Sequence, residues 1–232
     1  YSPENNGGSG YEIYSCCRAP STGYTYATGR GYSNRSGALL QQWTPSGNLG
    51  YSYLYRSTAS NIGIEPNNNS KCIARGSTDD YVYIACKYNY HAAVIQIRSN
   101  LTFRFVTWLT SPSGELGPKG LALDSDDNQY VVTGNETGKF FLFKITRSNQ
   151  LIAWQKNIGN MVDQYYMGSV AVSGNKVYVA AAKTFSGDAG RSLVVTAFNT
   201  SDGSVHNACK IKLNHSNGDV DIRPFDIHAT DT

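Results

Sequence analysis

Short apolar runs alternate with polar turns along almost the whole chain, and one arrangement of them recurs. The stretch 71–86 aligns without a gap to 119–134, and with one residue deleted it aligns to 169–182. Each copy consists of a short apolar run, a polar turn and an alternating run, which is the pattern of a β-hairpin. The sequence therefore predicts the same hairpin at three places.

Two further strand-like runs follow each hairpin, and Asn, Ser and Asp, which tolerate tight turns, separate them. These runs cover 92–97 and 101–109, 140–145 and 151–158, and 193–198 and 204–211. A more divergent first copy keeps the same order, with runs over 11–17, 23–28, 38–43 and 50–55. Four strands thus recur four times at a period of about 50 residues.

A four-stranded unit of this kind has a face too apolar to leave in water, and radial stacking of identical units covers it. We therefore predict an all-β fold, a β-propeller with four near-complete four-stranded blades and the first strand of a fifth. The alternative is a β-sandwich with Greek-key connections, which is not expected to repeat one four-strand cassette in one order.

The repeat also predicts the boundaries of the propeller. An N-terminal extension over 1–10 precedes it, and the propeller occupies 11–232, with blades over about 11–57, 71–110, 119–159 and 168–213. The stretch 224–232 aligns with 120–128 and stops in the turn, so a fifth blade is expected to start over 222–232. Together with the missing initiator Met, this leads us to expect a fragment of a longer chain.

Two segments, Gly120-Leu-Ala-Leu-Asp and Gln129-Tyr-Val-Val-Thr-Gly, carry a family resemblance. Over most of 11–213 the chain resembles propeller-repeat families of secreted proteins with quinoprotein-like or WD-like four-stranded blades. The resemblance implies a fold and not an activity. It also implies that the first strand of each blade lies nearest the central channel, with four apolar residues close to the axis: Ile73, Leu121, Val170 and Phe225.

Composition narrows the function classes. Charged residues make up 16% of the chain and the formal net charge is +3, without a cluster of Lys and Arg, so nucleic acid is not expected as a partner. No apolar run approaches the roughly 20 residues that span a bilayer, so we expect no membrane insertion. The first residues do not have the pattern of a signal peptide.

The cysteines and the Asn-x-Ser/Thr triplets point to an extracellular protein. Cys72 and Cys86 lie symmetrically about the turn near Asp79, so we predict that they face each other and form a disulfide, with two buried free thiols as the alternative. The pairing of Cys16, Cys17 and Cys209 stays open. Six triplets fall in turns or between blades, where a glycan can be carried, and they predict glycosylation at Asn34, Asn68, Asn100, Asn135, Asn199 and Asn214.

Catalytic and cofactor motifs are not recognisable. The four His residues, at 91, 206, 215 and 228, lack the close spacing of a local metal pair. Asp79-Asp80 and 126–128 are interpreted as turn caps, because a calcium-loop pattern is missing. The turn at 198–205 is similar to that of quinoprotein blades, but His206 and Asn207 stand where those repeats carry Trp, so we expect no cofactor.

The chain contains 17 Tyr, many of them in short clusters, and exposed Tyr suits contacts with proteins or sugars. The sequence favours a non-enzymatic extracellular glycoprotein, a structural or adhesive propeller of a cell-surface or filamentous assembly. Its expected partners are other extracellular proteins or copies of itself, with carbohydrate as a further candidate. The alternative is a secreted propeller enzyme or carbohydrate-binding module with its site at the mouth of the central channel.

Overall fold

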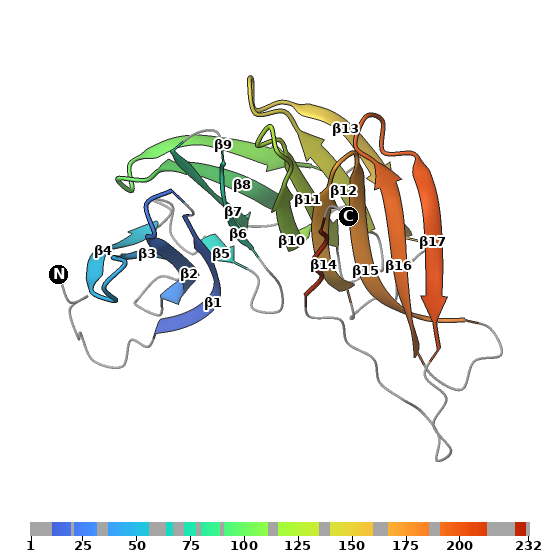
Figure 1. Ribbon diagram of the computed structural model, residues 1–232, viewed down its shortest axis with the longest axis horizontal. Coiled ribbons are helices and arrows are strands. Elements are labelled where there is room, and N and C mark those ends of the chain that lie inside the picture. Colours follow the sequence, from blue (N-terminus) through green and yellow to red (C-terminus); the bar gives the residue numbers. More distant parts are fainter. Residues whose placement is uncertain are drawn as a thin grey trace, which may run out of the picture. The chain divides into compact units, whose positions relative to one another are not determined.

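The computed structural model describes most of the chain, and its strands run from β1 to β17 (Figure 1). The described residues are 11–19, 21–31, 37–55, 64–66, 72–77, 80–88, 91–110, 116–134, 140–159, 167–185, 191–212 and 226–230. No helix of the described part is long and apolar enough to cross a membrane.

The strands form four antiparallel sheets, and within each sheet every strand pairs with the next one along the chain except β5, which pairs with β7. The first sheet contains β1 (Tyr11–Arg18), β2 (Thr25–Gly31), β3 (Gly37–Trp43) and β4 (Leu49–Tyr55). The second contains β5 (Ile64–Pro66), β6 (Ile73–Arg75), β7 (Tyr81–Tyr88), β8 (His91–Arg98) and β9 (Phe103–Leu109). The third contains β10 (Gly117–Leu123), β11 (Gln129–Gly134), β12 (Phe140–Ile145) and β13 (Ile152–Asn157). The fourth contains β14 (Met167–Ser173), β15 (Lys176–Thr184), β16 (Arg191–Asn199) and β17 (Val205–Ile211).

This up-and-down arrangement of four-stranded sheets is the architecture of propeller blades, and it confirms the predicted all-β, β-propeller fold. The fifth blade is not confirmed. Residues 226–230 lie in the described part but form no strand, and Phe225, which the repeat places in that blade, lies outside it.

The second sheet has a first strand in two pieces. Ile64 to Pro66 pair with Tyr88 to Cys86, and Ile73 to Arg75 pair with Ile84 to Val82, so β5 and β6 lie along the same edge of β7. Residues 67–71 stand between the two paired pieces. The first strand of this sheet therefore starts at Ile64, earlier than the repeat alone indicates.

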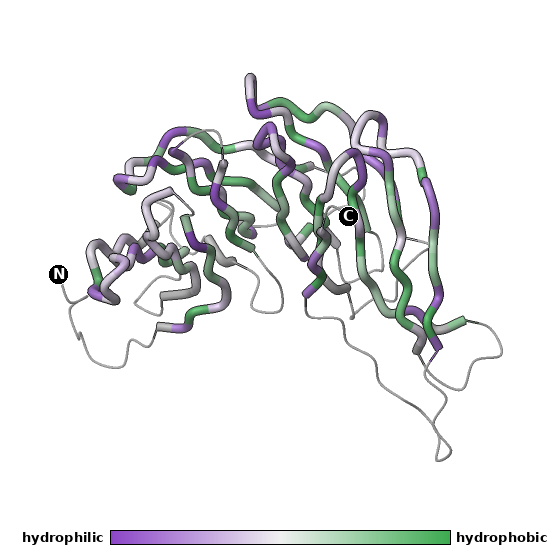
Figure 2. The backbone as a smooth tube through the Cα atoms, in the orientation of Figure 1, coloured by the Kyte–Doolittle hydropathy of each residue, from purple (hydrophilic) through white to green (hydrophobic). Residues whose placement is uncertain are grey.

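The chain divides into two compact units, residues 1–118 and 119–232, and each unit has its own core. In the first unit the core joins Tyr26 and Leu40 of the first sheet to Ile73, Ile84 and other residues of the second. In the second unit the core joins two sheets in the same way, through Tyr130, Val132, Phe140, Leu142, Val170, Val177, Val179 and Phe198. Figure 2 shows hydrophobic stretches along the central strands and hydrophilic stretches at the turns.

The two turns at one end of a sheet are tied together in three of the sheets. The amide of Ser99 donates to the carbonyl of Asp80 at 2.8 Å, and the amide of Thr200 donates to that of Asn175 at 3.0 Å. In the third sheet the amide of Arg147 donates to Asn128 Oδ1 at 3.1 Å. In each case the turn after the first strand of the sheet accepts a hydrogen bond from the turn before its last strand.

Phe198 tests the inter-sheet core of the second unit. Its side chain is 1% exposed, so Phe198→Ala should lower the free energy of unfolding by about 3–5 kcal/mol. The measurement is urea denaturation followed by circular dichroism. Leu151→Ala, at a position that is 62% exposed, is the control and should change it by no more than about 0.5 kcal/mol. Equal losses in the two variants would contradict the assigned core.

Candidate functional site

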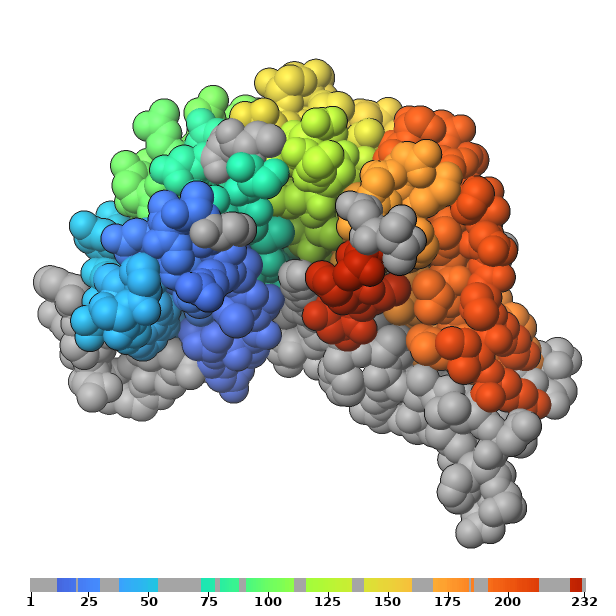
Figure 3. All heavy atoms as spheres, viewed as in Figure 1, coloured from blue at the N-terminus to red at the C-terminus, as the bar shows by residue number. Residues whose placement is uncertain are grey.

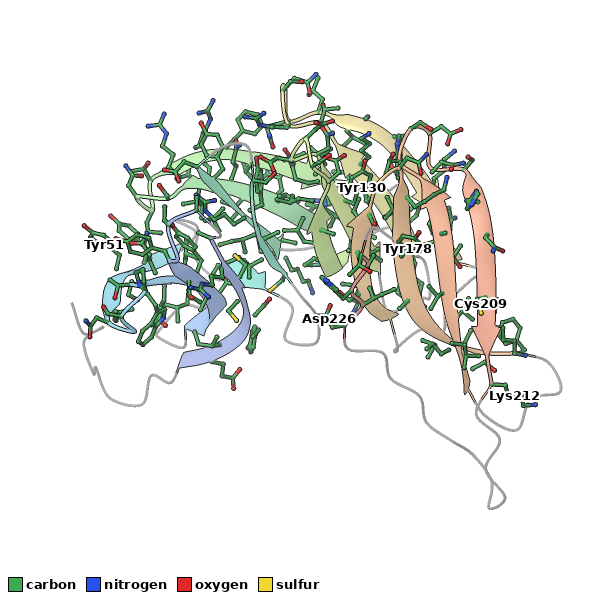
Figure 4. The ribbon with its side chains drawn as sticks, in the orientation of Figure 1. Tyr51, Tyr130, Tyr178, Cys209, Lys212 and Asp226 are labelled. Carbon is green, nitrogen blue, oxygen red and sulfur yellow. The ribbon has the colours of Figure 1, made fainter. Side chains whose placement is uncertain are left out.

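One row of side chains crosses every sheet at the same level and is called here the tyrosine row. It begins with a Tyr of the second strand, continues with a residue of the third strand directly opposite, and ends on the fourth strand. Because directly opposite residues point to the same face of a sheet, each row lies on one face. The four rows are Tyr26–Gln42–Tyr51, Tyr83–Gln96–Phe105, Tyr130–Lys144–Trp154 and Tyr178–Ala197–Asn207. Figure 4 labels Tyr130 and Tyr178, which begin two of the rows, and Tyr51, which ends another.

In the second unit the row of the third sheet holds the fourth sheet. Lys144 Nζ and Trp154 Nε1 donate to the carbonyl oxygen of Thr200 at 2.9 and 3.1 Å. Lys144 Nζ also lies 5.5 Å from the centre of the Tyr130 ring, and the rings of Tyr130 and Trp154 are 6.0 Å apart. A single turn carbonyl thus receives two donors from the neighbouring sheet.

Tyr130 is held as a neutral hydrogen-bond donor. Its hydroxyl donates to Asp124 Oδ2 at 3.0 Å, and burial together with the neighbouring Asp124 carboxylate raises the pKa of Tyr130 well above its usual range. A phenol in this state cannot act as a base or nucleophile near neutral pH. The arrangement therefore stabilises the joint between the sheets and does not activate Tyr130 for chemistry.

The first unit repeats the joint with different side chains. Gln42 Nε2 lies 3.0 Å from the Tyr26 hydroxyl and donates at 2.9 Å to the carbonyl oxygen of Ser99, in the turn before β9 of the second sheet. Arg75 and Asp80 form an ion pair at 2.9 Å beside this turn, and Ser99 Oγ donates to Asp80 Oδ2. Burial raises the pKa of Tyr26, as it does for Tyr130.

Gly203 shapes the turn of the fourth sheet on which Trp154 rests. Its φ is +68°, and a Cβ added there would lie 2.9 Å from the Trp154 ring and 2.9 Å from Lys156. Both the backbone conformation and the close approach of the indole therefore favour glycine. Gly203 belongs to the turn whose sequence is similar to that of quinoprotein blades. The tryptophan that packs on this turn, Trp154, comes from the preceding sheet.

The fourth strands carry the exposed apolar surface of the described part. All of its exposed large apolar side chains except Ile13 lie on these strands or next to one of them. Tyr51 and Tyr53 on β4 are 61% and 56% exposed, and Phe103 and Phe105 on β9 are 56% and 43% exposed. The others are Leu49, Trp108, Leu151, Ile152, Val205 and Ile211. In Figure 3 the segment around β13, in yellow, stands at the surface.

These strands also have a free edge. Among the described residues, β4, β9, β13 and β17 are edge strands, each paired with a single strand. An edge strand with exposed apolar side chains suits docking of a protein partner. The fourth strands are therefore the candidate functional site.

The five cysteines differ in burial. Cys72 and Cys86 are buried, Cys17 is half-buried, Cys16 and Cys209 are exposed, and all of them are free thiols in this structure. The expected register of Cys72 against Cys86 is wrong by one residue, because Ile73 pairs with Ile84 in the core and the Ala85 amide donates to the carbonyl of Cys72. The disulfide between Cys72 and Cys86 stays a prediction.

Two of the six predicted glycosylation sites can be located. Asn100 is exposed in the turn before β9, and Asn199 is half-buried at the end of β16. The other four, Asn34, Asn68, Asn135 and Asn214, lie outside the described residues.

The acidic turn of the third sheet serves its own backbone. Asp124 Oδ1 accepts hydrogen bonds from the amides of Asp126 and Asn128 at 3.0 and 2.9 Å, as a turn cap does. Asp79 and His215 lie outside the described part, and His91, His206 and His228 are exposed at separate places. Among the described residues, no three His, Cys, Asp or Glu side chains gather in a way that could hold a metal ion.

Sequence reasoning missed the tyrosine row. Strand pairing makes Tyr83 equivalent to Tyr130, whereas the gapless alignment of 71–86 to 119–134 places Val82 against Tyr130 and so hides the row. The Tyr clusters drew attention instead because they are conspicuous along the chain. The sequence pattern predicted the fourth strands, but it did not indicate that their apolar side chains are exposed.

Comparison with known proteins supports the fold alone. No family model and no curated protein matches the chain. A Synechocystis apocarotenoid oxygenase mutant is 11% identical, with a TM-score of 0.51 over 87% of this chain and 50% of that one. An engineered GH43 glycoside hydrolase is 13% identical, with a TM-score of 0.50 over 93% of this chain and 45% of that one. A Dos1 propeller is 9% identical, with a TM-score of 0.43 over 89% of this chain and 60% of that one. The chain thus spans about half the length of the first two proteins.

Two alanine variants separate the contribution of the Gly203–Trp154 contact to stability from that of backbone strain. Gly203→Ala should lower the free energy of unfolding by about 2–3 kcal/mol, since the new Cβ adds a clash with the indole to the strain of a positive φ. Gly47→Ala is the matched control, because Gly47 has a φ of +83° and nothing within 4 Å of an added Cβ, and it should lose only about 1 kcal/mol. Urea denaturation measures both, and an equal loss would show that the indole contact contributes nothing.

The thiols should differ in reactivity. Burial raises the pKa of Cys72 to about 12 and raises that of Cys86 further, so iodoacetamide should label Cys16 and Cys209 in the native protein and leave Cys72 and Cys86 unlabelled. Peptide mass spectrometry identifies the labelled cysteines. Rapid native labelling of Cys86 would contradict the assigned burial.

The two buried thiols also make stability depend on pH. Because the unfolded chain loses these protons near the ordinary pKa of 9.0, the free energy of unfolding should fall as the pH rises above about 9.

Proposed function

We propose that this chain is a non-enzymatic extracellular module, structural or adhesive in role, that binds other proteins and copies of itself through the fourth strands of its sheets. The observation that carries the proposal is the concentration of exposed apolar side chains on β4, β9, β13 and β17. Scattered apolar residues are normal on a protein surface, whereas gathering on one kind of strand indicates an interaction surface.

The chemistry of the tyrosine row supports the same proposal. Gln42 and Lys144 bond to turns of the following sheet and stiffen the joints between sheets. The phenols of Tyr26 and Tyr130 bond within their own sheets, to Gln42 and Asp124. A rigid scaffold that carries aromatic side chains on exposed strands loses little conformational entropy when it binds.

Tyr51 and Tyr53 favour carbohydrate as a second candidate ligand. They lie two residues apart on one face of β4, so that face carries two exposed aromatic rings, which suit contact with a sugar. Under this alternative the chain is a carbohydrate-binding module.

Self-association provides the direct test. Sedimentation velocity over a range of micromolar concentrations should show reversible association of the chain, and the double variant Tyr51→Ser/Tyr53→Ser should weaken it by roughly tenfold or more, as loss of aromatic anchors does. Ile13→Ser is the matched control, because Ile13 is 49% exposed but lies on a first strand, and it should leave association unchanged. A chain that stays monomeric, or a control that weakens association as much as the double variant, would overturn the proposal.

A further inference from the structure

Two predicted glycosylation sites occupy comparable places in different sheets. Asn100 lies in the turn between β8 and β9, and Asn199 begins the turn between β16 and β17. Their triplets, Asn100-Leu-Thr102 and Asn199-Thr-Ser201, are equally acceptable as sequence motifs. Their side-chain contacts are different.

Asn100 presents its side chain to solvent. Its Oδ1 accepts hydrogen bonds from the amide and the hydroxyl of Thr102, at 3.1 and 2.7 Å. Among the described residues these contacts use Oδ1 alone, and Oδ1 is not the atom that a glycan modifies. The side-chain nitrogen Nδ2 therefore lies at an exposed turn, where a large substituent disturbs no strand.

Asn199 is built into its turn through both ends of its amide. Nδ2 donates to Ser204 Oγ at 2.8 Å, and Oδ1 accepts from Lys176 Nζ at 2.6 Å, while the side chain is half-buried. The next residue, Thr200, provides the carbonyl that Lys144 and Trp154 bind. A sugar on Asn199 would replace one of the two hydrogens of a nitrogen that already bonds to Ser204, on a half-buried residue next to the joint with the third sheet.

We infer that the folded protein carries an N-linked glycan at Asn100 and none at Asn199. The inference rests on the proposed extracellular role, since the modification takes place in the secretory pathway. The donor class is a lipid-diphosphate-linked oligosaccharide. The bond between its anomeric carbon and phosphate oxygen breaks, a carbon–nitrogen bond to Asn100 Nδ2 forms, Nδ2 loses a proton and the lipid diphosphate leaves.

The experiment is secretion of the chain from a eukaryotic cell line behind a heterologous signal peptide. Peptide N-glycosidase in heavy-oxygen water converts each occupied Asn to a labelled Asp, which peptide mass spectrometry assigns. The label is expected at Asn100 in most secreted copies and at Asn199 in none. Thr102→Ala should abolish the label at Asn100, and the matched variant Thr102→Ser should keep it, because a hydroxyl completes the motif.

Label at Asn199 in folded secreted protein, or no label at Asn100, would overturn the inference, whether or not the other triplets are occupied. Ser201→Ala removes the Asn199 motif and is expected to change neither secretion nor the label pattern. The outcome is independent of the proposed binding role, because site occupancy is read from peptides and self-association from sedimentation. A chain that is labelled at Asn100 but never associates would retain this inference and remove the proposed function.

Discussion

The structure depends on the burial of one sheet face against the next sheet. In each unit, side chains of two consecutive sheets share a core, and neither sheet has an apolar face it could expose alone. The tyrosine row gives this packing its register, because a polar group of one sheet bonds to a turn carbonyl of the following one. Apolar burial is non-directional, whereas these hydrogen bonds fix which turn meets which row.

The same packing makes the strands of a sheet differ in burial. The second and third strands are covered on both faces, so they contain the largest buried side chains, such as Tyr83, Phe140 and Phe143. On the fourth strands β13 and β17 no residue is buried, and β17 is exposed along its whole length. A surface for partners can therefore vary on the fourth strands without affecting the core.

Much of the fold could be predicted from the sequence because the repeat is carried by local patterns. The hairpin over 119–134 alternates apolar and polar residues around an Asp- and Asn-rich turn, and such signals need no knowledge of the rest of the chain.

The candidate site could not be predicted in the same way. Exposure of Tyr51 and burial of Tyr26 depend on which sheet lies against them, and both residues sit in similar Tyr-rich stretches. The register of Cys72 depends on the pairing of Ile73 with Ile84, which symmetry about the turn does not reveal. The split first strand of the second sheet was hidden for the same reason, since pairing and not pattern joins β5 to β6.

That split strand has a consequence for the evolution and engineering of the chain. The edge of β7 is filled by β5 and β6 on either side of residues 67–71, so the ladder already tolerates added length at this point. Lengthening a loop costs little free energy, because the entropy of closure grows only slowly with the number of residues. New sequence, whether acquired by duplication or grafted as an affinity tag, can thus enter between the two halves of this edge strand, outside the residues that pair with β7.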